Sequence, residues 1–374
     1  MNEVLENRPT KAVISLSNLR HNLRVVKSNL DAKTKILGTV KANAYGHGIL
    51  EISQELIKNA VDYLGVAYIE EAIFLRKNGV KIPILVLGAI NKKQIPLFLK
   101  YDIEITSSSI DKSLEISKIA KKTGKIAKVH LKIDTGMERI GVHWYNAEQF
   151  ISQSQKMKNL DVVGIFSHLA KAENSKISNL QIDRFDKIIS KLKSAKKCPK
   201  IVHLLNSSGI VNYKKAQYNM VRAGIILYGY TDEIQEKLRP VMSLKTKVSY
   251  FKVVPKNTGI GYNHTFTTKQ QTRIITMPIG YGDGYFRAFS NKGIVGVRGK
   301  IYPVVGNVCM DQIMVDIGAD GEAYNGDDVL LFGEHENMKI PLEELSKKIN
   351  TIPYEILCAV SSRVPRVIVD NKNA

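Results

Sequence analysis

The hydrophobic pattern of the first two-thirds of the chain alternates between two periods. Short apolar runs rich in β-branched residues, such as residues 36–40, are followed by stretches whose apolar positions recur at helical spacing, such as residues 109–122. The short runs indicate strands and the longer stretches indicate amphipathic helices. The alternation therefore predicts βα units and a parallel sheet.

Counted along the chain, the strand pattern occurs eight times within about 220 residues, with helical stretches between the strands. This number favours a (β/α)8 barrel of the TIM type over an open doubly wound sheet. The predicted strands are residues 36–40, 64–67, 84–87, 103–106, 128–133, 162–167, 201–205 and 220–222. The predicted helices are residues 51–59, 70–78, 92–100, 109–122, 146–158 and 180–197.

The pattern changes after Pro240. Long helical stretches end, and alternating apolar runs separated by Gly, Pro, Asn and Asp indicate strands. We expect a (β/α)8 barrel over residues 1–235, followed by a mainly β C-terminal domain over residues 236–374. The runs in that domain are residues 244–254, 273–277, 294–297, 313–317 and 329–332, with a short helix at 341–349.

Composition fits a soluble protein of this size. The 374 residues are 44% hydrophobic and 24% charged, and no apolar run approaches the roughly 18 residues of a membrane span. Residues 1–11 lack the basic start and apolar middle of a secretory signal, so a cytoplasmic location is expected. The three cysteines form no CxxC pair, which predicts free thiols rather than a disulfide framework or a metal site.

A formal net charge of +20 raises the alternative of a nucleic-acid or membrane partner. The excess is mostly lysine on the polar faces of predicted helices, and it lacks the arginine and exposed aromatic residues of many recognition surfaces. A solvated surface is therefore favoured, and neither kind of partner is expected.

Candidate chemistry begins at Lys41, which follows the first predicted strand. Catalytic groups of parallel barrels lie at the carboxyl ends of strands. A lysine that loses hydration there has a lowered pKa, and its neutral amine can attack a carbonyl to form a Schiff base. Taken alone, Lys41 could also be a lysine that reaches out to solvent from a strand end.

A second signal lies at the ends of the last two barrel strands. Arg222 is followed by Gly224 and Ile225, and residues 206–209 read Asn-Ser-Ser-Gly. Glycine lets backbone N–H groups approach an anion, and these two strands form the usual phosphate-binding corner of the fold. A phosphate site combined with a Schiff-base lysine indicates pyridoxal 5′-phosphate.

Seven stretches together resemble the alanine racemase family, in that family's order and over nearly the whole chain. They are VKANAYGHG (40–48), KIDTGMERIG (132–141), NSSG (206–209), VRAGI (221–225), PIGYGDG (278–284), GNVCMDQ (306–312) and SSRVPR (361–366). The resemblance implies a pyridoxal-phosphate barrel with a β domain, and racemisation of alanine that supplies D-alanine for peptidoglycan. It also implies a homodimer whose active sites are shared between subunits.

The resemblance further implies the catalytic roles. Lys41 would hold the cofactor covalently and act as the base on one face of the substrate α-carbon, and Tyr262 of the other subunit would act on the opposite face. Racemisation needs a proton donor and a proton acceptor on opposite faces. His168 would hydrogen-bond Tyr262 and connect it to Arg222, which would lie at the cofactor ring nitrogen. Asp311 would help to position the site.

The same resemblance assigns the binding residues. Arg139 would contact the cofactor's phenolic oxygen and the substrate carboxylate, and Lys132, often carbamylated in this family, would steady Arg139. Met310 would bind the carboxylate through its amide, and Tyr281 would narrow the entrance. The phosphate contacts would be Tyr45, Ser207, Gly224, Ile225 and Tyr354. A plain ammonium at Lys132 and an ordinary packed tyrosine at Tyr354 stay open as alternatives.

Departures from the family pattern leave the preferred substrate open. Lys171 and Asn174 stand where small and acidic residues are expected, and Asn263 stands where glycine is common. One alternative is a racemase of broader specificity. Another is a fold-related pyridoxal-phosphate decarboxylase, which would call for an acidic residue in place of Arg222. A non-catalytic pyridoxal-phosphate carrier would not need the β domain that bears Tyr262.

Overall fold

The computed structural model describes residues 7–370. Its residues form two compact units. One is built from Arg20–Ala44 and Ile49–Leu238, and we call it the barrel unit. The other, the β unit, is built from the described residues up to Leu19, Tyr45–Gly48 and the residues from Arg239 onwards.

Eight parallel strands form the closed ring of the barrel unit, which confirms the predicted fold. β10 pairs with β2, and β5 pairs with β6, so the ring has no open edge. Every predicted strand is present, within a few residues of its expected bounds. The ring consists of β2 (Lys35–Thr39), β3 (Tyr63–Val66), β4 (Ile84–Val86), β5 (Glu104–Ser107), β6 (Ala127–Asp134), β8 (Leu160–Phe166), β9 (Ile201–His203) and β10 (Met220–Ala223), and β7 (Val142–His143) is a short addition beside β6.

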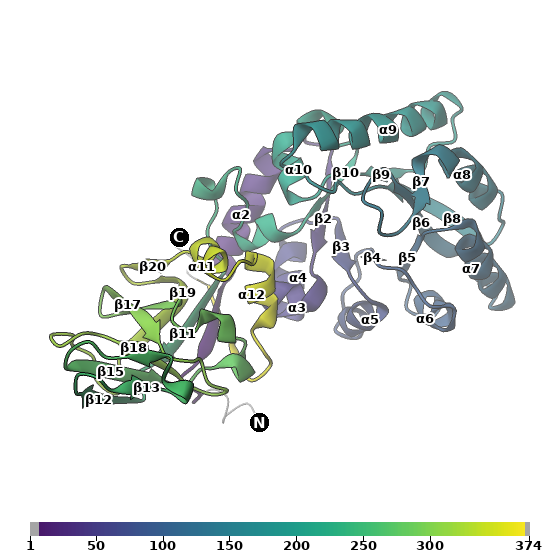
Figure 1. The fold of residues 1–374 in the computed structure, drawn as a ribbon. Helices are drawn as coiled ribbons and strands as arrows, with labels where there is room; N and C mark the ends of the chain where they lie inside the picture. The colour runs from purple at the N-terminus through teal and green to yellow at the C-terminus, as the bar shows by residue number, and fades with distance from the viewer. Residues whose placement is uncertain (1–6, 371–374) are drawn as a thin grey trace. The chain divides into compact units, whose positions relative to one another are not determined.

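Amphipathic helices follow these strands and form an outer layer around them (Figure 1). α9 begins at Ser175 rather than at residue 180, because the Asn174 side chain caps it by accepting a hydrogen bond from the Ile177 amide at 3.0 Å. No helix among residues 7–370 is long and apolar enough to cross a membrane. The helices are α2 (Leu16–Ser28), α4 (Ile49–Lys58), α5 (Ile69–Lys77), α6 (Ile95–Lys100), α7 (Ile110–Lys122), α8 (Ala147–Gln155), α9 (Ser175–Ser194) and α10 (Ser207–Asn212).

The barrel interior changes from apolar to polar along the strands. Leu37, Tyr63, Leu85, Ile201 and Met220 form one buried cluster from five strands. Because alternate residues of a strand face the same side, the residues two positions further along β9 and β10 also point inward. Those residues are a histidine and an arginine, so a polar layer follows the apolar one toward the carboxyl ends of the strands.

The β unit contains one sheet of ten strands, in the order β12-β15-β18-β17-β16-β19-β11-β1-β21 with β20 beside β19. β1 (Lys11–Ser15) comes from the predicted barrel range, yet it pairs with β11 and β21 of this sheet. The run predicted at residues 244–254 forms two strands, β11 (Met242–Lys247) and β12 (Tyr250–Val254), which lie far apart in the strand order.

The remaining elements of the β unit follow the predicted pattern of short strands and a late helix. They are β13 (Gly259–Ile260), β14 (Phe266–Thr267), β15 (Thr272–Met277), β16 (Ile294–Val297), β17 (Lys300–Val305), β18 (Ile313–Asp316), β19 (Asp328–His335), β20 (Met338–Ile340), β21 (Arg366–Val369), α11 (Leu342–Lys348) and α12 (Pro353–Ala359). Cys198, Cys309 and Cys358 are free thiols. Within residues 7–370, no group of histidine, cysteine and carboxylate side chains could hold a metal ion.

Candidate active site

Lys41 begins a left-handed turn just after β2. The helix α3 (Lys41–Tyr45) has φ and ψ values of 52° and 53° at Ala42, 54° and 45° at Asn43, and 53° and 53° at Ala44. None of these residues is glycine, and the left-handed conformation costs an ordinary residue about 1–2 kcal/mol. Such strain persists only where surrounding contacts enforce it, and it clusters at functional sites.

Three hydrogen bonds hold this turn in the barrel unit. The Ala42 amide donates to the Glu71 carboxylate at 2.6 Å, and the Ala44 amide donates to the Val40 carbonyl at 2.8 Å. The Asn43 side chain accepts a hydrogen bond from the Ile49 amide at 2.9 Å, which ties the turn to the start of α4. The half-buried Lys41 is therefore displayed at the carboxyl end of β2 by a rigid segment.

Arg222 on β10 makes four hydrogen bonds at the barrel mouth. It is 4% exposed, and its Nη1 donates to Nδ1 of His203 at 2.8 Å. Its Nη2 lies 3.0 Å from Nδ1 of His168, 2.8 Å from the Ser167 carbonyl and 2.7 Å from the Leu204 carbonyl. The hydrogen bonds found for Arg222 among residues 7–370 all use Nη1 and Nη2, which leaves the Nε–H for a bound group.

Burial sets the charge states of this cluster. Burial, and then the nearby Arg222 charge, lower the pKa of His168 and of His203 well below the ordinary histidine value. Burial and Arg139 lower the pKa of Arg222 to about 9, which still leaves the guanidinium charged at neutral pH. The structure therefore places a cation between two neutral imidazoles.

Lys132 on β6 carries a second unusual amine. Its Nζ is buried, has no hydrogen-bond partner among the described residues and lies 4.8 Å from the centre of the Phe166 ring. Burial, and then the Arg222 charge, lower the pKa of this amine well below its usual range. Arg139 follows nearby in a turn whose amides bond the Asp134 carboxylate, including the Arg139 amide at 3.3 Å.

Three of the residues predicted to bind the phosphate, Ser207, Gly224 and Ile225, lie together in the barrel unit. Ser207 begins α10, and its Oγ accepts hydrogen bonds from the amides of Gly224 at 3.1 Å and Ile226 at 3.3 Å. Ile225 follows Gly224 directly in the short turn after β10. These residues join the ends of the last two barrel strands.

The two tyrosines assigned to the phosphate are neighbours in the β unit. The ring centres of Tyr45 and Tyr354 are 5.9 Å apart. Tyr45 is buried, and burial followed by Tyr354 raises its pKa. Gly46 has a φ of 82°, and a Cβ atom there would lie 2.2 Å from the Leu357 carbonyl oxygen, so only glycine fits.

The remaining predicted residues of the β unit are exposed. Tyr262 is 70% exposed, and its carbonyl accepts a hydrogen bond from the Asn307 side chain at 2.8 Å. Met310 is 54% exposed and Tyr281 is 44% exposed. Backbone bonds join their segments, for example from the Tyr281 amide to the Cys309 carbonyl at 3.0 Å.

Asp311 is held by a residue that sequence reasoning did not assign. The Arg363 guanidinium lies 2.7 Å from the Asp311 carboxylate and 3.4 Å from Asp283. Arg363 stands in the SSRVPR stretch, so the motif was visible while its contact was not. Glu104, His130 and His203 were also missed, although polar residues inside buried strands are a readable signal.

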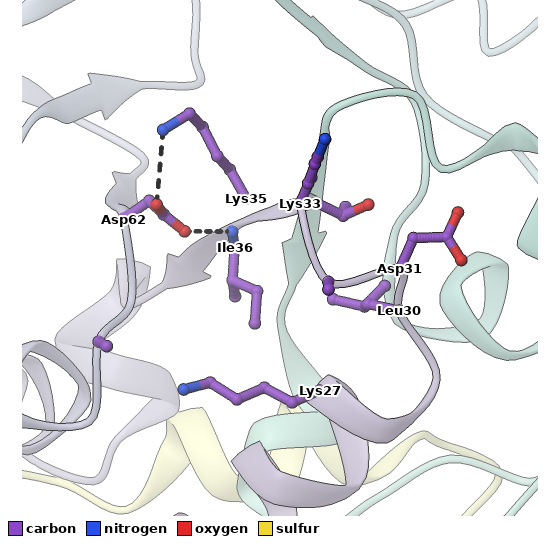
Figure 2. Close-up of a pocket in the computed structure, with 10 residues that line it drawn as sticks. Lys27, Leu30, Asp31, Lys33, Lys35, Ile36 and Asp62 are labelled. Atoms are coloured by element: carbon purple, nitrogen blue, oxygen red, sulfur yellow. Dashed lines mark hydrogen bonds and ion pairs between the residues drawn. The ribbon is translucent and has the colours of Figure 1, made fainter.

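A pocket at the other end of β2 is not part of this arrangement (Figure 2). There the Asp62 carboxylate accepts a hydrogen bond from the Ile36 amide at 2.8 Å and lies 3.6 Å from Lys35 Nζ. Asp62 thus bonds the amino end of β2, whereas Lys41 follows the carboxyl end. Polar residues at the amino ends of barrel strands usually serve stability.

Comparison with known proteins gives a consistent result over nearly the whole chain. Residues 14–232 match the family model "Alanine racemase, N-terminal domain", and residues 241–368 match "Alanine racemase, C-terminal domain". The chain is 41% identical over 371 residues to "Alanine racemase 2" of Caldanaerobacter subterraneus, which covers 97% of this chain and 96% of the relative.

Solved structures agree. An alanine racemase from Clostridium difficile matches with a TM-score of 0.91 and 41% identity, over 97% of this chain and 96% of that chain. An alanine racemase from Bartonella henselae with covalently bound pyridoxal phosphate matches with a TM-score of 0.86 and 29% identity, over 96% and 99% of the two chains.

Proposed function

We propose that Lys41 and Tyr262 exchange protons with the substrate. The chain belongs to the alanine racemase family, and it interconverts L-alanine and D-alanine. We infer that the D-alanine serves peptidoglycan synthesis. Free thiols at all three cysteines fit a reducing compartment such as the cytoplasm, which we propose as its location.

Pyridoxal 5′-phosphate is the cofactor of this family, and the residues present fit it. Arg222 offers an unused N–H for the ring nitrogen, Lys41 offers an amine, and Ser207, Gly224 and Ile225 offer a hydroxyl and amides for the phosphate. Tyr45 and Tyr354 would add phenolic hydroxyls. When bound, the cofactor delocalises the negative charge left at the α-carbon by proton loss.

Arg222 shapes this chemistry because guanidinium donates hydrogen bonds and does not give up its proton. An acceptor nitrogen facing Arg222 therefore stays unprotonated, which limits how far charge is drawn from the α-carbon. Rapid return of the proton is then favoured over competing reactions. A decarboxylase of this fold would call for an acidic residue at this position, so Arg222 favours a racemase over a decarboxylase.

Lys41 would remove or return the α-proton on one face of the substrate, and Tyr262 would do so on the other. Arg222 donates to Nδ1 of His168, so the proton of this neutral imidazole resides on Nε2. That N–H would donate a hydrogen bond to the Tyr262 oxygen and stabilise its phenolate. A tyrosine with an unperturbed pKa near 10 otherwise makes a poor base.

Substrate binding would rest on Arg139 and on the backbone amide of Met310, both directed at the carboxylate, with Tyr281 at the entrance and Asp311 in support. We infer that the Lys132 amine, in the neutral form that its lowered pKa favours, adds CO2 and releases a proton. The resulting carbamate would be an anion able to pair with Arg139. The carbamate is supported by the buried Lys132 Nζ, which has no hydrogen-bond partner among the described residues.

We infer a homodimer in which each Tyr262 completes the site of the other copy. The exposure of Tyr262, Met310 and Tyr281 supports this, because a second chain would cover these large side chains. No other kind of macromolecular partner is needed by this scheme.

The observation that carries the proposal is the environment of Arg222, and solvent exchange at the α-carbon tests the two bases. In D2O the wild type is expected to place deuterium on the product from either enantiomer. Tyr262→Phe is expected to lower this exchange at least 100-fold, more for one enantiomer than for the other. Tyr250→Phe, at another exposed tyrosine of the β unit, is the control.

Unimpaired exchange in Tyr262→Phe would remove Tyr262 from the mechanism. Racemase activity measured on a panel of amino acids separates alanine racemase from a racemase of broader specificity. Lys171, Asn174 and Asn263, which depart from the family pattern, leave this substrate preference open. Release of CO2 from a basic amino acid would support the decarboxylase. Cofactor binding without any turnover would support the carrier.

A further inference from the structure

A buried chain of hydrogen bonds extends from Arg222 into the barrel, away from the groups assigned above. Nδ1 of His203 accepts from Arg222 at 2.8 Å, and Nε2 of His203 lies 3.0 Å from Nδ1 of His130. Nε2 of His130 lies 2.7 Å from the Glu104 carboxylate. Glu104 is 4% exposed and both histidines are fully buried.

Arg222 and Glu104, the two ends of this chain of hydrogen bonds, determine which nitrogen of each histidine between them carries the proton. Arg222 can only donate, so Nδ1 of His203 accepts and its proton resides on Nε2. That N–H donates to Nδ1 of His130, which places the His130 proton on Nε2. Glu104, as a carboxylate, can only accept, so both ends demand the same pair of tautomers.

Local backbone features are built around His130. Gly164 pairs with His130, and a Cβ atom at position 164 would lie 2.2 Å from Nδ1 of His130. The pairing of β6 with β8 shifts its register between Val129 and His130, where β8 has one residue more than β6. Such irregularities redirect side chains, and glycine admits the imidazole that any larger residue would displace.

His203 is fixed in the same way by its neighbours. Its ring stacks on Phe166, with ring centres 4.6 Å apart and an interplanar angle of 7°. The Arg222 guanidinium lies over the same Phe166 ring, 5.4 Å from its centre. The imidazole that holds Arg222 is therefore itself held in one orientation.

We propose that Glu104 and His130 are positioning residues for racemisation, because the Glu104–His130–His203 chain holds Arg222 at the geometry and charge state that its reaction requires. The proposal rests on the role given to Arg222 above. Glu104 also sets a buried negative charge opposite Arg222, with two neutral imidazoles between them. Outer groups of this kind commonly change activity about 10–100-fold without touching the reacting atoms.

Two variants separate the parts played by the carboxylate. Glu104→Leu removes the acceptor, whereas Glu104→Gln keeps an acceptor oxygen and removes the charge. We expect kcat to fall about tenfold or more in Glu104→Leu and less in Glu104→Gln, with KM for alanine nearly unchanged. Glu115→Gln on the surface of α7 is the matched control and should leave kcat unaltered.

The deciding measurement needs neither cofactor nor activity. In cofactor-free protein labelled with 15N-histidine, the wild type is expected to show His130 and His203 with protonated Nε2, bare Nδ1 and slow exchange of the Nε2 protons. In Glu104→Leu a second tautomer and faster exchange should appear. A thermal melt identifies any variant that fails to fold, and then Glu104→Gln carries the comparison.

An unchanged tautomer ratio and exchange rate in a folded Glu104→Leu protein would overturn the proposal, as would an unchanged kcat. Gly164→Ala should reproduce both effects, because it displaces the His130 ring while leaving Glu104 in place. If the wild type itself failed to racemise alanine, the proposed function would fall, and the histidine spectra would still report whether the chain of hydrogen bonds exists.

Discussion

Lys132 carries a buried amine beside two arginines, without a hydrogen-bond partner among the described residues. Its lowered pKa favours the neutral amine, which is the form that reacts with CO2. We predict a carbamate signal when the protein is equilibrated with 13CO2 and examined by NMR. Lys132→Met should lack this signal, and a signal that persists in this variant would assign it to another lysine.

His168 and His203 should make stability depend on acid pH. Their pKa values are lowered in the folded state, so between the folded and ordinary values the unfolded chain binds more protons. The free energy of unfolding should therefore fall as pH drops below about 6.5, by about 1.4 kcal/mol per pH unit for each histidine. Denaturant titrations at pH 7, 6 and 5 measure the slope.

His203→Gln provides the comparison for that slope. It removes one of the two titrating groups, so its dependence on pH should be shallower than that of the wild type. Equal slopes would mean that His203 takes up its proton in the folded state as readily as in the unfolded state.

Single residues also mark the limit of sequence reasoning. Lys41, Arg222 and Ser207 could be selected because strand ends of a barrel converge, and the structure brings Arg222 and Ser207 to adjacent strand ends as expected. The contacts of Glu104 and His130 could not be predicted, because they depend on the register shift between β6 and β8. A one-residue shift changes which side chains meet, and the apolar pattern does not specify it.

At the scale of elements, the alternating pattern predicted all eight barrel strands, because buried parallel strands are continuous apolar runs. It did not predict the left-handed turn of α3, since residues 41–45 contain no glycine to signal one. It also missed β1, whose alternation is brief and whose partners β11 and β21 lie more than two hundred residues away.

Gly46, in the segment that follows α3, allows a test of the tight packing there. Gly46→Ala meets both an unfavourable φ of 82° and the Leu357 carbonyl, whereas Gly79, with a φ of 85°, has nothing within 4 Å. Gly79→Ala should cost about 1 kcal/mol from backbone strain alone. Gly46→Ala should cost clearly more, about 3 kcal/mol, as measured by chemical denaturation. Similar losses of unfolding free energy in the two variants would mean that the segment containing Leu357 moves to accommodate the added methyl group.

At the scale of the whole molecule, the formal charge of +20 has a surface explanation. The lysines in the second half of α7, and those at and just after the end of α9, are exposed, which fits the solvated helix faces expected from the sequence. These exposed lysines are Lys118, Lys121, Lys122, Lys191, Lys193, Lys196 and Lys197, and further exposed lysines lie elsewhere on the surface.

In the proposed mechanism, Lys41 of one copy works with Tyr262 of another. Lys41→Ala and Tyr262→Phe proteins, each nearly inactive alone, can be combined in one dimer by refolding them together. One of its two sites then contains both intact residues, so the mixture is expected to regain racemase activity. Mixed dimers that form, as shown by two distinct affinity tags, and yet stay as inactive as their parents would contradict it.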